Sequence, residues 1–184
     1  MKKAQLTAFI ISALLFSSVE FGCRPTDTEK KVEQKDSVEK LSEKPNSTQL
    51  LNGIELNAKE VEVYRASLSL ETGDLVPSNN TVALGDRISM TLNIINGWKE
   101  IDGKSFLGAS EIITTDNGTT LLDTGDLFAS NDEGLTASDA KLISLKARVT
   151  DSPAVPVEYY MVSFRVWDKK GNGEITGKYK FYIK

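Results

Sequence analysis

The 184-residue sequence contains no histidine and a single cysteine, Cys23. Without histidine, the chain lacks the commonest general base near neutral pH and the commonest metal-binding side chain. A single cysteine cannot form a disulfide within the chain. No glycine-rich phosphate-binding loop follows a strand-like segment, so the sequence predicts no nucleotide site. These absences favour a binding or structural role over an enzymatic one.

The first 22 residues have the layout of an export signal. Lys2 and Lys3 precede an apolar run over residues 8–16, and Gly22 stands directly before Cys23. The apolar run is about half as long as the ~20 residues that a membrane-spanning helix needs. We therefore interpret residues 1–22 as a cleaved signal peptide rather than a membrane span.

This segment resembles the signal of a bacterial lipoprotein, in which a small residue precedes a lipidated cysteine. Glu20 stands where that motif prefers an aliphatic residue, a relaxed form found among Bacteroidota lipoproteins. The resemblance implies that Cys23 carries acyl chains such as palmitate and anchors the protein in the cell envelope. Arg24 replaces the aspartate of the inner-membrane retention rule, which favours the outer membrane. With Cys23 lipidated, no thiolate remains for catalysis or for a metal.

Residues 23–48 form a charged linker in this interpretation. After Cys23 the segment has no aromatic residue, few apolar residues and mixed charges of both signs. Such a composition cannot bury enough apolar surface to offset the entropy lost on ordering. As a flexible coil, 25 residues reach roughly 25–30 Å. The linker would hold the following domain away from the membrane.

Residues 49–184 predict a single all-β domain, because apolar residues recur there with the period of two that is typical of strands. The clearest strands are 87–95, 142–149 and a final pair joined by a turn at 168–173. We also expect a strand over 60–70, and two short strands joined by a turn at Asp116-Asn117-Gly118 within 112–122. Tyr64, Ala66, Leu68 and Leu70 share one face of the strand over 60–70, and Val61 and Val63 share the other, so the alternation leaves its inward face open.

Seven to nine short strands in this length favour an antiparallel β-sandwich, with a small closed β-barrel as the alternative. The sandwich resembles an immunoglobulin-like arrangement. Residues 168–174 superficially resemble a calcium-binding EF-hand loop, but Lys170 and Tyr179 stand where that loop needs oxygen ligands. The flanking alternation predicts a hairpin turn instead.

Charge is distributed unevenly along the predicted domain. Residues 105–140 carry seven carboxylates and no lysine or arginine. Ca²⁺ takes six to eight oxygen ligands from flexible loops, which makes a calcium site one hypothesis for this stretch. Acidic residues also fill turns for backbone reasons, and that interpretation stays open beside it. The candidate ligands are Asp123, Asp126, Asp132 and Glu133.

Three aromatic residues are candidates for binding sugar rings: Trp98, Trp167 and Tyr159. Aromatic side chains in a small sandwich also serve as core or rim packing. A hydrolase acting through paired carboxylates, Asp123/Asp126 or Asp132/Glu133, is a third alternative, although nothing in the sequence places one member of either pair in an apolar pocket. The partners we expect are the membrane, through the anchor, and an envelope protein or a glycan. The net charge of −4 argues against nucleic acid.

Overall fold

The computed structural model describes residues 47–150 and 156–184. The predicted signal peptide, the lipidation site Cys23 and almost all of the predicted linker lie outside the described residues. Pro45–Lys184 form one compact unit. Within the described part of the chain, no helix is long and apolar enough to cross a membrane.

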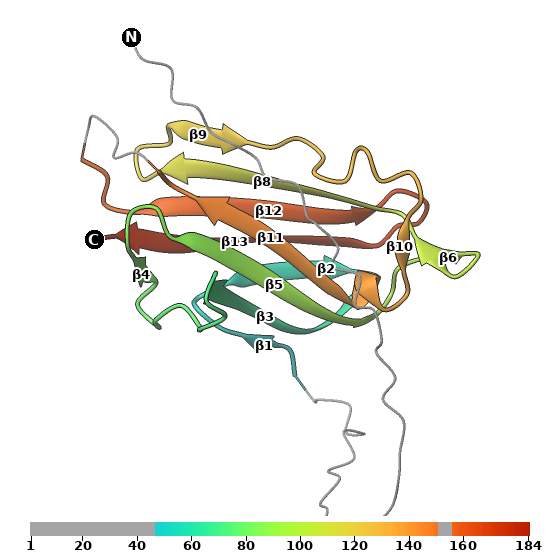
Figure 1. Ribbon diagram of the computed structural model, residues 1–184. Helices are drawn as coiled ribbons and strands as arrows, with labels where there is room; N and C mark the ends of the chain where they lie inside the picture. The colour runs from blue at the N-terminus through green and yellow to red at the C-terminus, as the bar shows by residue number, and fades with distance from the viewer. Residues whose placement is uncertain (1–46, 151–155) are drawn as a thin grey trace, which may run out of the picture. The chain divides into compact units, whose positions relative to one another are not determined.

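Eight strands of four residues or more carry the domain, and five two-residue strands and one short 3₁₀ helix complete it (Figure 1). In chain order the elements are β1 (Gln49–Leu50), β2 (Glu55–Lys59), β3 (Glu62–Leu70), β4 (Thr81–Val82), β5 (Arg87–Asn96), β6 (Glu100–Ile101), β7 (Lys104–Ser105), β8 (Leu107–Thr115), β9 (Thr120–Asp123), β10 (Leu135–Thr136), η1 (Asp139–Lys141), β11 (Leu142–Arg148), β12 (Tyr160–Asp168) and β13 (Glu174–Ile183).

Two open sheets pack face to face and confirm the β-sandwich over the closed barrel. One sheet has the order β1-β3-β5-β11, and the larger has the order β2-β13-β12-β8-β9 with β4 also paired to β13. Strands β6, β7 and β10 form a small separate sheet. The buried side chains of both large sheets make one continuous hydrophobic core. The pairing is antiparallel except where the two-residue strands β1 and β4 join β3 and β13.

The alternation seen in the sequence sets which side of each long strand faces the core. Apolar residues at every second position of β5, β11 and β12 are buried, as predicted, while Lys178 and Lys180 of β13 point outward. Burying each such side chain stabilises the fold by about 1.5–3 kcal/mol. The inward residues of these three strands are Ile88, Met90, Leu92, Ile94, Ile143, Leu145, Ala147, Tyr160, Val162, Phe164 and Val166.

Strand β3 buries residues from both of the faces that the alternation separates. Val63 is 5% exposed, Ala66 and Leu68 are fully buried, and Tyr64 and Leu70 are only partly buried. The pairing with β5 is irregular on both sides of Val63. An extra residue in one strand of a pair reverses the alternation that follows it. The bulge therefore lets residues from both faces of the predicted strand contribute to the core.

The predicted turn at Asp116-Asn117-Gly118 joins β8 to β9. The amide of Gly118 donates to the carbonyl of Thr115 at 2.9 Å, and Gly118 has φ +85°. A type I turn followed by a left-handed glycine is a common three-residue hairpin loop. Strand β8 begins at Leu107, five residues before the predicted start. The charged residue Glu111, at an inward position, concealed this extension of the alternation.

The turn between β12 and β13 is organised by Asp168, which is 7% exposed. Its Oδ1 accepts the amides of Lys170 and Gly171, each at 2.8 Å, and its Oδ2 accepts the amide of Lys99 at 2.7 Å. The carboxylate thus satisfies backbone donors of its own turn and of a neighbouring loop. The hairpin interpretation of residues 168–174 is confirmed.

Candidate functional site: a polar pocket beside strand β13

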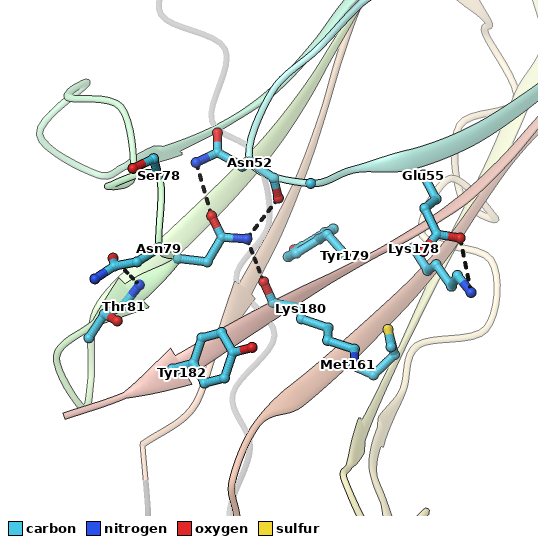
Figure 2. A pocket seen from close by; sticks show the side chains of 12 residues that line it. Asn52, Glu55, Ser78, Asn79, Thr81, Met161, Lys178, Tyr179, Lys180 and Tyr182 are labelled. Atoms are coloured by element: carbon cyan, nitrogen blue, oxygen red, sulfur yellow. Dashed lines mark hydrogen bonds and ion pairs between the residues drawn. The ribbon is translucent and has the colours of Figure 1, made fainter.

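A pocket of about 600 Å³ lies beside β13, at the point where the strand paired with its edge changes from β2 to β4. Strand β2 pairs with β13 as far as Lys178, and β4 pairs with it from Tyr182 onward. Between these two strands the edge is bordered by the loop at Asn52 and the loop over residues 78–81 (Figure 2). The outer face of β13 and Met161 of β12 complete the lining.

Two asparagines form the framework of this pocket. The Nδ2 of Asn80 donates to the carbonyls of Asn52 and Lys180, both at 2.7 Å. The Nδ2 of Asn52 donates to Oδ1 of Asn80 and to the carbonyl of Val76, both at 3.0 Å. Both residues have φ +56°, a left-handed conformation that asparagine tolerates better than most residues. Their amide groups are therefore occupied by the fold and hold the two loops against β13.

Other polar groups of the pocket remain available to a ligand. The Oδ1 of Asn79 accepts the amide of Thr81 at 3.1 Å, and its Nδ2 has no hydrogen-bond partner in the described part of the chain. Within the described residues, the hydroxyls of Ser78 and Thr81 have no hydrogen-bond partner in the protein. Figure 2 shows Ser78, Asn79 and Thr81 together on one side, with Tyr182 close to them. Hydroxyl, amide and aromatic residues therefore line the same side of the pocket.

Two lysines contribute positive charge. Lys178 forms an ion pair with Glu55, with Nζ and Oε2 3.0 Å apart. Lys180 lies over the ring of Tyr159, with its Nζ 4.0 Å from the ring centroid. Tyr159 and Tyr182 meet edge to face, with centroids 6.4 Å apart. Lys180 is thereby held in an aromatic corner at the border of the pocket.

The structure separates the three aromatic residues predicted to bind a ligand. Only Tyr159 lies beside the pocket, through its contacts with Lys180 and Tyr182. Trp167 lies at the opposite end of β12, about 26 Å away by the rise of a strand. Its indole covers Gly108, and the guanidinium of Arg165 lies 4.9 Å from the ring centroid. Trp98 packs against the core and donates from Nε1 to the carbonyl of Ala140 at 3.0 Å.

The four acidic residues considered for calcium serve different contacts. Asp126 forms an ion pair with Lys169 at 2.8 Å and accepts the amides of Ala109 and Phe128. Burial alone would raise the pKa of Asp126, but these three partners together lower it. Asp123 accepts the amide of Gly125 at 3.2 Å, and the side chains of Asp132 and Glu133 are exposed.

No group of three or more potential metal ligands forms within residues 47–150 and 156–184. The calcium hypothesis therefore rests on the sequence alone. The acidic stretch contributes no residue to the pocket beside β13.

A buried polar pair lies behind the pocket. Glu111 of β8 and Tyr179 of β13 are each 1% exposed, and both point into the core. In the part of the chain that the structure describes, Glu111 Oε1 and the Tyr179 hydroxyl have no hydrogen-bond partner. Burial raises the pKa of Glu111 to about 7, and burial together with the charge of Glu111 raises the pKa of Tyr179. Protonation of Glu111 removes a charge from the core.

Sequence reasoning did not find Asn52, Asn79 and Asn80. Asn52 and Asn80 are 28 residues apart, and their contact depends on the tertiary fold. One signal was present in the segment Pro77-Ser78-Asn79-Asn80, which is rich in turn formers and lies between apolar positions. That signal predicts a turn but does not reveal that the turn closes a pocket.

Comparisons with known proteins do not assign the chain to a family. No protein-family model matches the chain, and no curated protein matches it in sequence. Among solved structures, it is similar to the crystal structure of the C-terminal domain of wzt, with a TM-score of 0.43 and 12% sequence identity. That similarity covers 75% of this chain and 82% of the other. A likeness of this degree carries no functional information. The described fold defines this chain as a β-sandwich protein.

Proposed function

We propose that this chain is a lipid-anchored envelope protein whose β-sandwich binds a saccharide in the pocket beside β13. The proposal rests on one observation: some polar side chains of the pocket hold the fold together, and others are left available to a ligand. Asn52 and Asn80 are used by the fold, whereas the Nδ2 of Asn79 and the hydroxyl of Thr81 have no hydrogen-bond partner among the described residues. A framework with free polar groups is the usual construction of a ligand site.

A saccharide suits the chemistry of these groups. Sugar hydroxyls both donate and accept hydrogen bonds, and amide and hydroxyl side chains do the same. The apolar face of a sugar ring also needs a flat apolar surface, which an aromatic ring with a polar tip supplies. Tyr182 is 36% exposed and lies at the pocket, so its ring is accessible for such a contact.

Binding is favoured over hydrolysis at this site. Glycoside hydrolysis generally needs two carboxyl groups on opposite sides of the scissile bond. The pocket lining contains one carboxylate, Glu55, and it is paired with Lys178. The lining residues therefore provide neither the pair nor a carboxyl in an apolar environment.

The anchor part of the proposal rests on the sequence. The basic and apolar start, the residue pair Gly22-Cys23 and the charged linker together support attachment through acyl chains. Arg24 supports the outer membrane. An envelope glycan is then a ligand within reach of the domain.

A glycan array probed with the full-length protein in detergent tests the proposed function. We expect retention on a subset of glycans, and loss of that retention in the Asn79→Ala and Tyr182→Ala variants. Trp167→Ala, a change at the far end of β12, serves as the matched control and should bind as the wild type does. Failure to retain any glycan, or equal retention by the two pocket variants, would show that the pocket is not a saccharide site.

A further inference from the structure

We propose that the pocket selects acidic saccharides, with the ammonium of Lys180 pairing with a carboxylate of the ligand. This inference rests on the proposed function, because it names the class of saccharide that the same pocket takes.

Lys180 is held at the pocket by contacts on its main chain and its side chain. Its carbonyl accepts the Nδ2 of Asn80 at 2.7 Å, which fixes the backbone between β2 and β4. Its Nζ lies 4.0 Å from the centroid of Tyr159, a cation–π distance. An exposed lysine normally samples many rotamers. The ring of Tyr159 restricts this freedom, and Lys180 is itself a lining residue of the pocket.

The charge of Lys180 is not neutralised by the protein. Among the described residues, Lys180 forms no ion pair, whereas Lys178 on the same strand pairs with Glu55. A neutral aromatic ring attracts a cation but leaves its net charge in place. One lysine of the pocket is therefore compensated and the other is free to pair with an anion.

Of the two acidic residues near Tyr159, Asp116 has a carboxylate that is engaged by backbone amides. Asp116, whose backbone amide bonds the carbonyl of Tyr159 at 3.1 Å, accepts the amide of Asn117 at 3.0 Å and the amide of Glu158 at 3.1 Å. Both oxygens of the Asp116 carboxylate therefore accept backbone amides. The carboxylate of Glu158 is a neighbour in sequence of Tyr159 and is not a lining residue of the pocket.

The neutral groups fit the rest of an acidic sugar. The Nδ2 of Asn79 and the hydroxyl of Thr81 are suited to ring hydroxyls, and the ring of Tyr182 is suited to an apolar sugar face. A carboxylate held by Lys180 would fix the orientation of the ring among these groups. Charge-assisted hydrogen bonds are roughly twice as strong as neutral ones, so the carboxylate would dominate selection.

Matched ligands test the inference directly. Oligosaccharides of uronic acids, and the same oligosaccharides as neutral methyl esters, are titrated calorimetrically into the full-length protein in detergent. We expect the acid form to bind about tenfold more tightly than the ester, the affinity ratio that a typical hydrogen bond to a charged group supplies. Lys180→Gln should abolish this preference, and Lys146→Gln, the same charge change at an exposed site on the other sheet, should retain it.

The two proposals fail in different ways. Equal affinity for acid and ester, or a preference that survives Lys180→Gln, overturns the acidic selection and leaves saccharide binding intact. Binding of neither form, combined with an empty glycan array, overturns the proposed function and the inference together. Added salt should weaken acid binding and leave ester binding unaffected, because screening acts on the ion pair.

Discussion

Asn52 and Asn80 bind one another reciprocally: Asn52 Nδ2 donates to Asn80 Oδ1 at 3.0 Å, and Asn80 Nδ2 donates to the carbonyl of Asn52 at 2.7 Å. The pair also links the two sheets. Asn52 Oδ1 accepts the amide of Leu68 in β3, and Asn80 Nδ2 donates to Lys180 in β13. Because each side chain is committed to the fold, both residues should matter for stability more than for ligand contact.

Replacing Asn80 by alanine removes three side-chain hydrogen bonds and should lower the free energy of unfolding by about 4 kcal/mol. Each lost hydrogen bond contributes about 1 kcal/mol, and a left-handed conformation at alanine costs roughly 1 kcal/mol more. Asn80→Gly, which tolerates φ +56°, should recover about 1 kcal/mol of that loss. Urea denaturation measures both variants.

Asn79→Ala is the matched control for this prediction, because Asn79 is exposed and its φ is not positive. It should change stability by less than about 0.5 kcal/mol and still weaken saccharide binding. Equal stability of Asn80→Ala and the wild type would contradict the framework role of Asn80.

Glu111 should make the domain more stable at acidic than at neutral pH. Its pKa rises from an ordinary value of 4.5 to about 7 in the folded state. Between those two values the folded state holds a proton that the unfolded state has released, so stability is full below pH 4.5 and falls as pH rises to 7. The loss from pH 5 to pH 8 amounts to about 2–3 kcal/mol, at 1.36 kcal/mol per pKa unit.

Glu111→Gln should remove most of this pH dependence, since the amide does not ionise. Free energies of unfolding at pH 5 and pH 8 decide the matter, with the exposed Glu133→Gln as a control that should keep the wild-type profile. Parallel profiles for the wild type and Glu111→Gln would mean that Glu111 does not titrate in this range.

Gly108→Ala should destabilise the domain by about 2 kcal/mol through overpacking. A Cβ at this position would overlap the indole of Trp167, which lies directly over Gly108. The ring must then move, and the fluorescence of Trp167 should shift toward longer wavelength as it becomes more exposed.

A double mutant isolates this contact. In a Trp167→Ala background, Gly108→Ala should cost less than 0.5 kcal/mol, roughly the value for an unconstrained surface change. Ser110→Ala, on the same face of β8, is the single-site control. An undiminished cost in the double mutant would place the strain elsewhere.

Cys23→Ala should release the protein from the membrane fraction while the β domain stays folded. Without acyl chains the contribution of about 0.8 kcal/mol per buried CH₂ disappears. Fractionation of cells followed by a high-salt wash measures the effect, and circular dichroism of the released protein checks its folding. Continued sedimentation with membranes after the wash would exclude Cys23 as the anchor.

The sequence predicted the long strands well because their burial is periodic. The apolar residues from Ile88 to Ile94 alternate without interruption, and the turn at Asp116-Asn117-Gly118 is specified by its own residue types. Prediction from the sequence failed where an extra residue shifts the alternation of buried and exposed positions, as at the bulge beside Val63. It also failed where a charged residue occupies a core position, as at Glu111.

The candidate site was harder to predict than the strands. Of the predicted aromatic residues, the pocket adjoins only Tyr159, because sequence does not reveal which end of a strand an aromatic residue shares with distant loops. The framework residue Asn80 donates to Lys180, 100 residues away. Such long-range contacts are fixed by sheet order, which a single sequence does not encode in any local pattern.

The way in which one edge of β13 is covered also affects whether the protein can associate with itself. An uncovered strand edge is a template for pairing with another copy, and such pairing leads to aggregates. Here β2, the side chain of Asn80 and β4 cover successive lengths of the edge of β13. Loss of the Asn80 amide would open the middle of this edge. The same asparagine that shapes a pocket therefore also protects the sheet against intermolecular strand addition.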